Sequence, residues 1–357
     1  MKNICIIGCG GFIGSHLVEH FLANSRWRIY GVDISAQKIR PYLNHDRFSY
    51  HHIDAKNIHQ LQPLIRKSDC VISLAAICNP SYYNTEPLLT LEAGFLNHME
   101  LVKLCCKLKK WLIHFSTCEV YGKTTSHLLG NNTLARDPKY YVLNEDTTPL
   151  IMGPVHAQRW IYASAKQLLE RTIYAYGFEK GLDYTIIRPF NFIGPRMDYI
   201  SGVDGDGLPR VLACFMGALL FKKPLMLVDG GKNRRNFTYI SDAVEAIDLI
   251  LKTPGKSKGE IFNIANPDNE TTIRDLAYLM IDIYRQLKPG AAKTKFAVKN
   301  IAGTKFYGKG YEDCDRRVPD MSKAVRLLGF KPKVDLRSAM EKTIDYYIKE
   351  YATGLKP

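Results

Sequence analysis

Residues 114–122, HFSTCEVYG, place three reactive side chains next to one another. The first half of the segment is apolar and hydroxylic, as expected for a buried strand, and the chain should turn after it. The hydroxyl of Thr117, the thiol of Cys118 and the carboxylate of Glu119 all fall where that strand ends. Packing at a buried strand end requires neither a thiol nor a carboxylate. The segment is therefore a candidate for proton-transfer chemistry.

Tyr162 and Lys166 form a second candidate group in YASAKQLLERTIYAY, a stretch with the pattern of a helix. Residues four apart lie on one helical face, so the phenol and the ammonium should be neighbours. A cation beside a tyrosine lowers the phenol pKa from about 10 towards the range in which it can act as a base. The spacing alone would also suit an ordinary amphipathic surface pair.

A glycine-rich turn, GCGGFIG, lies between an apolar strand and the helical pattern SHLVEHFLAN. Small residues there allow backbone N–H groups and a helix N-terminus to approach a pyrophosphate. Glycine also serves plain turns, but the position between strand and helix predicts a dinucleotide site. The residues assigned to it are Gly8, Gly11, Phe12, Ile13 and Gly14.

Asp33 follows 19 residues after Gly14, at the end of the second predicted strand. An acidic group there accepts hydrogen bonds from a ribose diol and repels a 2′-phosphate, which favours NAD over NADP. Asp54, in HHIDAKN, has two interpretations that stay open: a contact with the adenine end of the cofactor, and a helix N-cap. Ala75, near the end of CVISLAA, is also assigned to the cofactor site.

The elements that must position these residues alternate along the first half of the chain. KNICIIG, WRIYGVD, CVISLAA, WLIHFS and YTIIRPF are typical of buried parallel strands, and helical patterns separate them. The alternation predicts an α/β fold with a Rossmann-type, doubly wound parallel sheet. We expect residues 1–189 and 236–265 to form the NAD-binding domain. Residues 190–235 and 266–357 should form a smaller, largely C-terminal substrate-binding lobe.

Composition narrows the class of protein. Of the 357 residues 46% are apolar, but no apolar run approaches the roughly 20 residues that span a bilayer, so we expect a cytoplasmic protein without a membrane segment. The nine cysteines form no CxxC pair, so neither a metal site nor a disulfide scaffold is expected. The net charge of +14 suits either nucleic acid or a small polyanionic substrate. A non-catalytic RNA-binding protein is the alternative from another class, although such a protein could have lost its tyrosine, lysine and glutamate.

The glycine turn, Thr117 and the YxxxK pair together resemble the extended short-chain dehydrogenase/reductase superfamily. There the tyrosine takes a proton from a substrate hydroxyl while hydride passes to NAD. RPFN, ending at Asn191, and DGGKNRR, ending at Arg235, resemble its nucleotide-sugar branch. This resemblance implies that Asn191 and Arg235 contact the diphosphate of a UDP-sugar, for which a planar guanidinium is well suited. A surface position in a basic turn is the alternative for Arg235.

Thr117-Cys118-Glu119, together with Arg317 in DRRVPDM, resembles enzymes that oxidise and decarboxylate UDP-glucuronic acid. Oxidation at C4 makes the sugar a β-keto acid, which loses CO₂. The resemblance implies that Glu119 helps to deprotonate the C4 hydroxyl and to hold the ring. Arg317 would bind the carboxylate or act near the carbon being protonated. In plain decarboxylases and xylose synthases serine typically precedes the glutamate, whereas this chain has Cys118.

AAIC-x-P-xx-YN, HFSTCEVYGK, RW-x-YA-x-AKQL, GLPRVLACF and YGKGYEDCDRRVPDM extend the resemblance, over essentially the whole chain, to the UDP-apiose/UDP-xylose synthase family. In that family the 4-keto-pentose is cleaved between C2 and C3, and rejoining C2 to C4 contracts the ring. Reduction then gives UDP-apiose, whereas reduction of the uncontracted ketone gives UDP-xylose. The resemblance implies a redox-neutral lyase with UDP-glucuronic acid as substrate, NAD as cofactor and a homodimer formed around residues 95–110 and 162–176. The alternative is an enzyme that stops at UDP-xylose or the UDP-4-keto-pentose.

Ring contraction gives a reason for two thiols, Cys78 and Cys118. It needs proton transfers at hydroxyls that simple decarboxylation leaves alone, and a thiol, with a reference pKa of about 8.5, exchanges protons near neutral pH more readily than a serine. Both cysteines would act as acid/base groups with Asp313 nearby, and burial as small hydrophobes is the alternative. Tyr83 is expected to hydrogen-bond to the substrate carboxylate or to cover the cleft, and Arg210 is expected to bind substrate.

Overall fold

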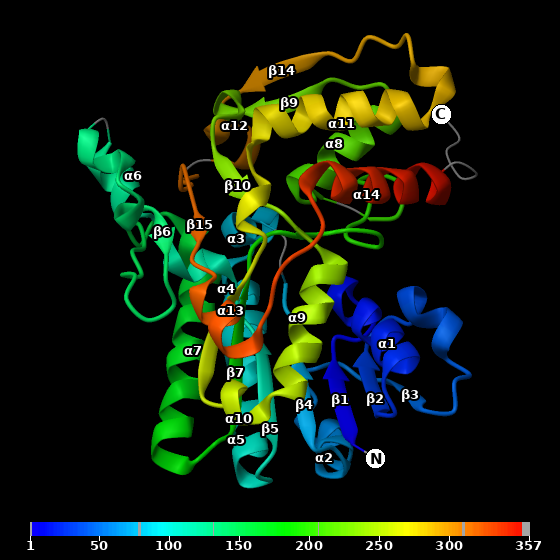
Figure 1. The fold of residues 1–357 in the computed structure, drawn as a ribbon, viewed down its shortest axis with the longest axis vertical. Coiled ribbons are helices and arrows are strands. Elements are labelled where there is room, and N and C mark those ends of the chain that lie inside the picture. Colours follow the sequence, from blue (N-terminus) through cyan, green and yellow to red (C-terminus); the bar gives the residue numbers. More distant parts are fainter. Residues whose placement is uncertain (1, 78–79, 131, 206, 309–310, 352–357) are drawn as a thin grey trace.

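The computed structural model describes residues 2–77, 80–130, 132–205, 207–308 and 311–351. Its centre is a seven-stranded parallel sheet with the strand order β12-β7-β5-β4-β1-β2-β3 (Figure 1). The strands are β1 Asn3–Ile7, β2 Arg28–Asp33, β3 Phe48–His52, β4 Cys70–Ser73, β5 Trp111–Phe115, β7 Tyr184–Pro189 and β12 Glu260–Ile264. The strand order reverses beside β1, which is the topological switch point of a doubly wound fold. The predicted fold class is confirmed.

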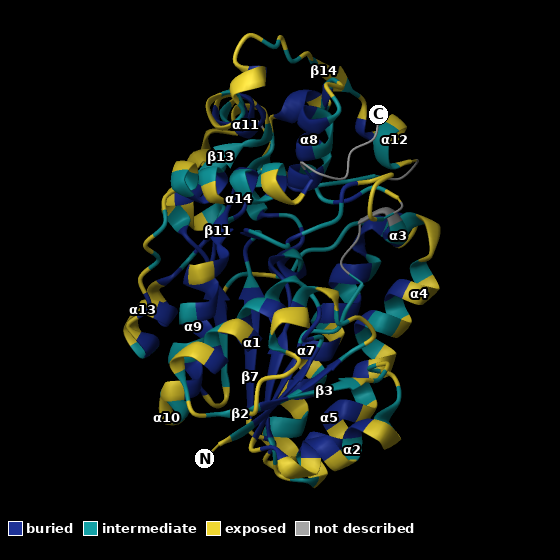
Figure 2. Cartoon of the chain, turned by 90° about the vertical axis from the view of Figure 1, so that its right-hand side faces the viewer, coloured by how far each residue is buried: buried dark blue, intermediate teal, exposed yellow. Residues whose placement is uncertain are grey.

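Helices cover both faces of this sheet. One face carries α1 Phe12–Asn24 and α9 Ile240–Lys252, and the other carries α2 Ile58–Lys67, α5 Asn97–Lys107 and α7 Ile161–Lys180. Successive side chains of a strand point to opposite faces. Ile4 and Ile6 of β1 accordingly pack with the first layer, and Cys5 and Ile7 with the second. Figure 2 shows the buried strands between helices whose outer surfaces are exposed.

The smaller lobe stands above the C-terminal ends of the strands (Figure 1). Its main elements are α8 Val211–Leu220, α11 Ile273–Leu287, α14 Leu336–Glu350 and the paired strands β9 Leu225–Val228 and β14 Val298–Ile301. Short pairs β8 Phe192–Ile193 with β11 Thr238–Tyr239, β10 Arg234–Asn236 with β13 Glu270–Thr272, and β6 Val142–Leu143 with β15 Val318–Pro319 connect distant segments. The remaining α-helices are α3 Pro80–Thr85, α4 Pro87–Leu91, α6 Thr125–Leu129, α10 Pro254–Ser257, α12 Gly303–Tyr307 and α13 Ser322–Leu328.

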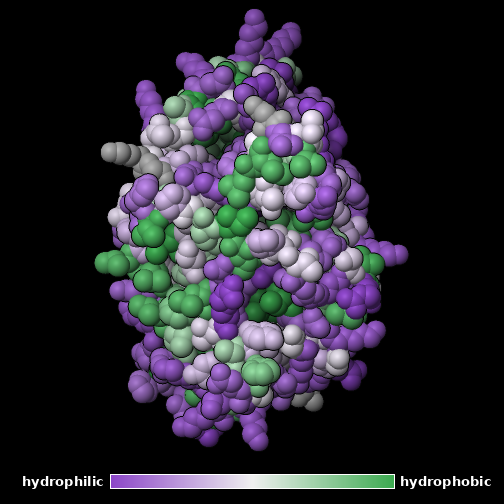
Figure 3. All heavy atoms as spheres, turned by 90° about the vertical axis from the view of Figure 1, so that its left-hand side faces the viewer, coloured by the Kyte–Doolittle hydropathy of each residue, from purple (hydrophilic) through white to green (hydrophobic). Residues whose placement is uncertain are grey.

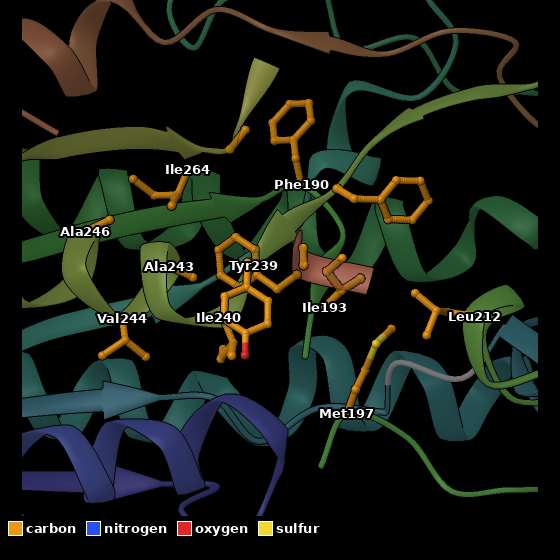
Figure 4. Close-up of a cluster of buried hydrophobic side chains, with 14 of the residues drawn as sticks. Phe190, Ile193, Met197, Leu212, Tyr239, Ile240, Ala243, Val244, Ala246 and Ile264 are labelled. Carbon is orange, nitrogen blue, oxygen red and sulfur yellow. The ribbon is translucent and has the colours of Figure 1, made fainter. Parts of the chain in front are cut away.

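One hydrophobic core continues from the sheet into the smaller lobe. Phe190 and Ile193, which follow β7, lie with Leu212 of α8 and Ile240 of α9 in the same buried cluster (Figure 4). The boundaries expected between domain and lobe thus cross a shared core, and they remain a prediction. Among the described residues no helix is long and apolar enough to cross a membrane.

Helix α7, which carries Tyr162 and Lys166, is anchored at several points. Its C-terminal end is set by Gly181, whose positive φ of 69° allows the N–H groups of Gly181 and Leu182 to bond back to the last turn. In its middle, Glu170 accepts hydrogen bonds of 3.0 and 2.6 Å from the buried guanidinium of Arg188 on β7. Helix α7 is therefore tied to the sheet by a buried ion pair.

Replacing Glu170 by alanine should destabilise the protein strongly, because it leaves the Arg188 charge buried and unpaired. We expect a loss of about 3–5 kcal/mol in the free energy of unfolding, measured by urea denaturation. The matched control is Glu341→Ala, which breaks an exposed pair with Arg337 and should cost about 1 kcal/mol or less. Equal losses in the two variants would contradict the role assigned to the buried pair.

Candidate active site

A cavity of about 810 Å³ lies between the C-terminal ends of the strands and the smaller lobe. It brings together most of the residues predicted from sequence: Gly8, Gly11, Phe12, Ile13, Gly14, Tyr83, Thr117, Cys118, Glu119, Tyr162, Lys166, Asn191, Arg210, Arg235, Asp313 and Arg317. Asp33, Asp54 and Ala75 are not among its lining residues, and Cys78 lies outside the described residues. In the part of the chain that the structure describes, no group of three or more His, Cys, Asp or Glu side chains is placed to hold a metal ion.

The glycine turn has the crowding that a dinucleotide site requires. A Cβ on Gly14 would lie 2.1 Å from the carbonyl oxygen of Gly8, and a Cβ on Gly10 would lie 1.9 Å from that of Ser35. The carboxylate of Asp33 accepts the N–H of Gly10 at 2.8 Å and that of Ser35 at 3.0 Å. Residues without side chains thus leave the N-terminus of α1 open to an anion, with an acidic group beside it. These features fit NAD.

Asp54 and Ala75, the two other residues assigned to the cofactor site, do not line the cavity. Asp54 accepts the N–H of Lys56 at 3.0 Å, and the cap of α2 is Asn57, which accepts the N–H of Gln60. The N-cap interpretation of Asp54 is therefore wrong, and its contact with adenine remains a prediction. Ala75 lies against the turn, since its backbone nitrogen would be 2.9 Å from a Cβ on Gly8.

The residues expected to oxidise the substrate, Thr117, Tyr162 and Lys166, lie where α7 approaches the C-terminal end of β5. We call them the oxidation group. Lys166 is buried and donates a hydrogen bond of 3.0 Å to the carbonyl oxygen of Phe115. The ring of Tyr162 is stacked on that of Tyr83 from α3, with 4.9 Å between centroids and 6° between planes. Thr117 caps the following 3₁₀ turn by accepting the N–H two residues on at 3.2 Å. Tyr162 and Lys166 thus both line the cavity, and the ring of Tyr83 covers one face of the tyrosine.

Glu119 has a partner that sequence reasoning missed. Both of its oxygens accept hydrogen bonds from the guanidinium of Arg159, at 2.5 and 2.8 Å, and that guanidinium lies 5.5 Å from the ring centre of Tyr83. Burial raises the pKa of Glu119, but Arg159 outweighs burial and the pKa is lowered. Glu119 is therefore a carboxylate at neutral pH. A sequence signal existed, because Arg159 precedes Tyr162 by three residues and so falls near it at the start of α7.

Asp313 lies close to three arginine side chains of the site. One of its oxygens accepts hydrogen bonds from Arg235 at 2.6 Å and from Asn233 at 3.1 Å, and the other lies 3.9 Å from Arg317 and 4.0 Å from Arg159. Burial raises the pKa of Asp313, but the three guanidinium groups hold it well below the usual range. Asp313 is thus a permanent hydrogen-bond acceptor. Arg235, expected at a diphosphate, is held by this carboxylate.

Cys118 lies at the cavity wall with only 5% of its surface exposed. Burial raises the pKa of its thiol to about 11, although the nearby Arg317 and Arg235 act in the opposite direction. At neutral pH the group is therefore a thiol, which can donate a proton but is not poised as a thiolate base. The acid/base role that it is expected to share with Cys78 remains a prediction, because Cys78 lies outside the described residues.

The two other substrate-binding candidates are held by neighbours in the smaller lobe. Asn191 has a positive φ of 42° and donates a hydrogen bond of 2.8 Å to the carbonyl oxygen of Asn236. Arg210 binds the carboxylate of Asp198 at 2.8 and 3.0 Å. Both line the cavity, and their contacts with substrate remain predictions.

The doubly wound sheet, the glycine turn and the buried tyrosine–lysine pair define a nicotinamide-dependent enzyme with a cavity between the sheet and the smaller lobe. The model of the NAD dependent epimerase/dehydratase family matches residues 4–265. The chain belongs to this family, and NAD is the cofactor that the family uses.

More specific similarity comes from curated relatives. The chain is 48% identical to UDP-D-apiose/UDP-D-xylose synthase of Oryza sativa subsp. japonica, over 99% of this chain and 91% of that relative. It is 46% identical to UDP-D-apiose/UDP-D-xylose synthase 1 of Arabidopsis thaliana, over 99% of this chain and 93% of that relative. Among solved structures, PbgP3 protein from Burkholderia pseudomallei superimposes with a TM-score of 0.83 at 30% identity, covering 99% of this chain and 98% of that chain.

Replacing Asp33 by asparagine should weaken NAD binding by about tenfold. The carboxylate has two oxygens that accept hydrogen bonds, whereas the neutral amide has one, so the ribose diol should lose an acceptor. Binding of NADP should weaken less, since the charge that repels a 2′-phosphate is gone. Isothermal titration of both cofactors provides the measurement. Asp183→Asn is the matched control, because this exposed aspartate lies before β7 at the opposite edge of the sheet, and it should leave both affinities within a factor of about two. An unchanged affinity for NAD in the Asp33 variant would contradict the assignment.

Proposed function

We propose that the protein uses NAD to convert UDP-glucuronic acid into UDP-apiose, with UDP-xylose as a parallel product. The observation that carries the proposal is the buried cluster of Cys118, Glu119, Arg159, Asp313 and Arg317 beside the oxidation group in one cavity. The names of the relatives at 46–48% identity support the same activity. The net reaction takes up one proton and releases CO₂, so it is a redox-neutral decarboxylation and the enzyme is a carboxy-lyase.

Oxidation at C4 is assigned to the residues at the start of α7. When bound, NAD supplies a hydride acceptor and later returns the hydride. Tyr162 takes the proton of the C4 hydroxyl, and the positive charge of Lys166 favours the phenolate. Thr117 orients the same hydroxyl. The negative charge of Glu119 makes it an acceptor for a ring hydroxyl, as expected for a group that holds the sugar.

Decarboxylation is assigned to the arginines. Arg317 is buried, donates to the carbonyl oxygen of Gly122 at 3.3 Å and lies beside the cavity, where a fixed positive charge can attract the sugar carboxylate. Loss of CO₂ leaves a carbon that must gain a proton. Arg317, which lies beside the cavity, is also our candidate for the group that acts near this carbon.

Ring contraction is assigned to two groups, one that donates a proton and one that accepts a hydrogen bond. Retro-aldol cleavage removes a proton from one hydroxyl, and the aldol step that rejoins C2 to C4 returns one to a carbonyl oxygen. The Cys118 thiol is suited to giving a proton and the Asp313 carboxylate to accepting a hydrogen bond. Cys78 is proposed as the second acid/base group. The positive charge of the chain, +14, favours a substrate with a diphosphate and a carboxylate.

Incubation of the purified protein with NAD and UDP-glucuronic acid, with the pentoses identified by NMR, tests the proposal. We expect both UDP-apiose and UDP-xylose. UDP-xylose or the 4-keto-pentose alone would overturn the apiose assignment in favour of a plain decarboxylase. No turnover, combined with salt-sensitive RNA binding, would favour the RNA-binding alternative instead.

The variant Cys118→Ser tests the thiol in the same assay. A serine hydroxyl is a far weaker acid than a thiol, so the share of UDP-apiose should fall by about tenfold while CO₂ release persists. Cys106→Ser, in α5 and away from the cavity, is the matched control and should keep the parental product ratio. A Cys118 variant with that same ratio would contradict the role of the thiol.

We also propose a cytoplasmic homodimer formed through α4, α5 and α7. Leu88 on α4 and Phe178 on α7 are 74% and 83% exposed. Leu96, just before α5, and Leu168 on α7 are exposed as well, and both α4 and α5 pack against α7. The side of the molecule on which α6 and α7 lie in Figure 1 is drawn in Figure 3, where hydrophobic side chains lie among hydrophilic ones. Such side chains suit a helical interface between two copies.

Leu168→Glu should shift the protein from dimer to monomer, because a charge would be buried at the centre of the proposed interface. Sedimentation velocity measures the change. Leu128→Glu, on the separate helix α6, is the matched control and should leave the dimer intact. A wild-type protein that sediments as a monomer would contradict the proposed interface.

A further inference from the structure

Asp313 and Arg317 reach the active site on one short segment, residues 311–319, which we call the strap. The strap comes from the smaller lobe and lies against the segment that follows Glu119. Its end, β15, pairs with β6, and the Cys314 thiol lies 3.7 Å from the hydroxyl of Thr124. Two groups that act on the sugar acid are therefore placed by how the strap docks, rather than by the sheet that places Tyr162 and Lys166.

Glu312 joins the strap to the 3₁₀ turn that precedes α7, and this contact is closer than the 4.0 Å approach of Asp313 to Arg159. One of its carboxylate oxygens accepts a hydrogen bond of 2.9 Å from the indole N–H of Trp160 and lies 2.9 Å from the ammonium of Lys123. Hydrogen bonding from Lys123 is the largest cause of the lowered pKa of Glu312. The contact is closely packed, because a Cβ on Gly153 would lie 2.3 Å from the indole nitrogen and 2.4 Å from the same carboxylate oxygen. We call Glu312, Trp160 and Lys123 the clasp.

Each member of the clasp is next to a residue of the site. Trp160 is adjacent to Arg159, the partner of Glu119. Lys123 follows Gly122, whose carbonyl oxygen holds Arg317. Glu312 is adjacent to Asp313. A single carboxylate thus ties together the three segments that carry the sugar-acid machinery.

We propose that Glu312 is a positioning residue that determines, through Asp313 and Arg317, how much product is UDP-apiose rather than UDP-xylose. The inference rests on the proposed function. Oxidation at C4 and the final reduction use Tyr162 and Lys166, which the sheet and α7 hold without the strap. Ring contraction also needs the strap. A loosened strap should therefore slow contraction selectively and leave more of the ketone to be reduced directly.

The experiment compares Glu312→Gln and Lys123→Met with wild type. The first keeps an acceptor for Trp160 but loses the charge, and the second loses the ammonium. In each we expect the ratio of UDP-apiose to UDP-xylose to fall by about tenfold, because small displacements at a reacting centre have effects of that size or larger. The first-turnover rate of NAD reduction should stay within a factor of about two of wild type. The double variant should be no worse than either single variant, since both break one contact.

Glu245→Gln is the matched control, because it also removes the charge of a glutamate that pairs with a lysine, here the exposed Lys333 at 2.7 Å. It should keep the wild-type product ratio. An unchanged ratio in the clasp variants, additive effects in the double variant, or an equal loss of NAD reduction would each overturn the inference. The wild-type protein tests the proposed function separately. If wild type makes no UDP-apiose, the proposed function and the inference are both overturned. If wild type makes UDP-apiose and the variants keep its product ratio, only the inference is overturned.

Discussion

The ion pair between Glu119 and Arg159 is the interaction on which the rest of the site depends. A charge removed from water must be paired and hydrogen-bonded, or the folded state is strongly penalised. Here two carboxylates are surrounded by three guanidinium groups, and Asp313 connects those of Arg235, Arg317 and Arg159. Each member is acceptable in the interior only because the others are present. The position of every charged group is consequently fixed by its neighbours before any substrate binds.

Such a cluster needs a fold that delivers charges from separate segments to one place. The parallel sheet does so for half of them, since residues after neighbouring strands meet at the same edge. Glu119 follows β5 and the tyrosine–lysine pair lies on α7, which Glu170 and Arg188 fix to the sheet. From the smaller lobe, the strap supplies Asp313 and Arg317, and β10 supplies Arg235. A hydrophobic core that runs through both parts packs them against each other.

Local pattern was sufficient to predict the sheet, the glycine turn and the YxxxK pair, because their periodicity or spacing is set by backbone geometry. The residues on the smaller-lobe side of the cavity, Asn191, Arg210, Arg235, Asp313 and Arg317, could be predicted only through resemblance. Arg159 and Glu312 were missed, since their significance lies in partners 40 and 152 residues away. The acidity of Cys118 was also unpredictable. Its reference pKa suggested a group that ionises easily, whereas burial raises the pKa to about 11 and leaves the thiol protonated.

The charges of the cluster also bear on the order of the chemistry. Three guanidinium groups against two carboxylates leave this cluster with one net positive charge. A sugar carboxylate would balance that charge, and its loss as CO₂ would restore the imbalance, so the cluster favours the acid over the neutral ketone that follows it. The later steps therefore cannot rely on the same attraction. They depend on hydrogen bonds to fixed donors and acceptors, and the geometry of the strap matters most after the carboxylate has gone.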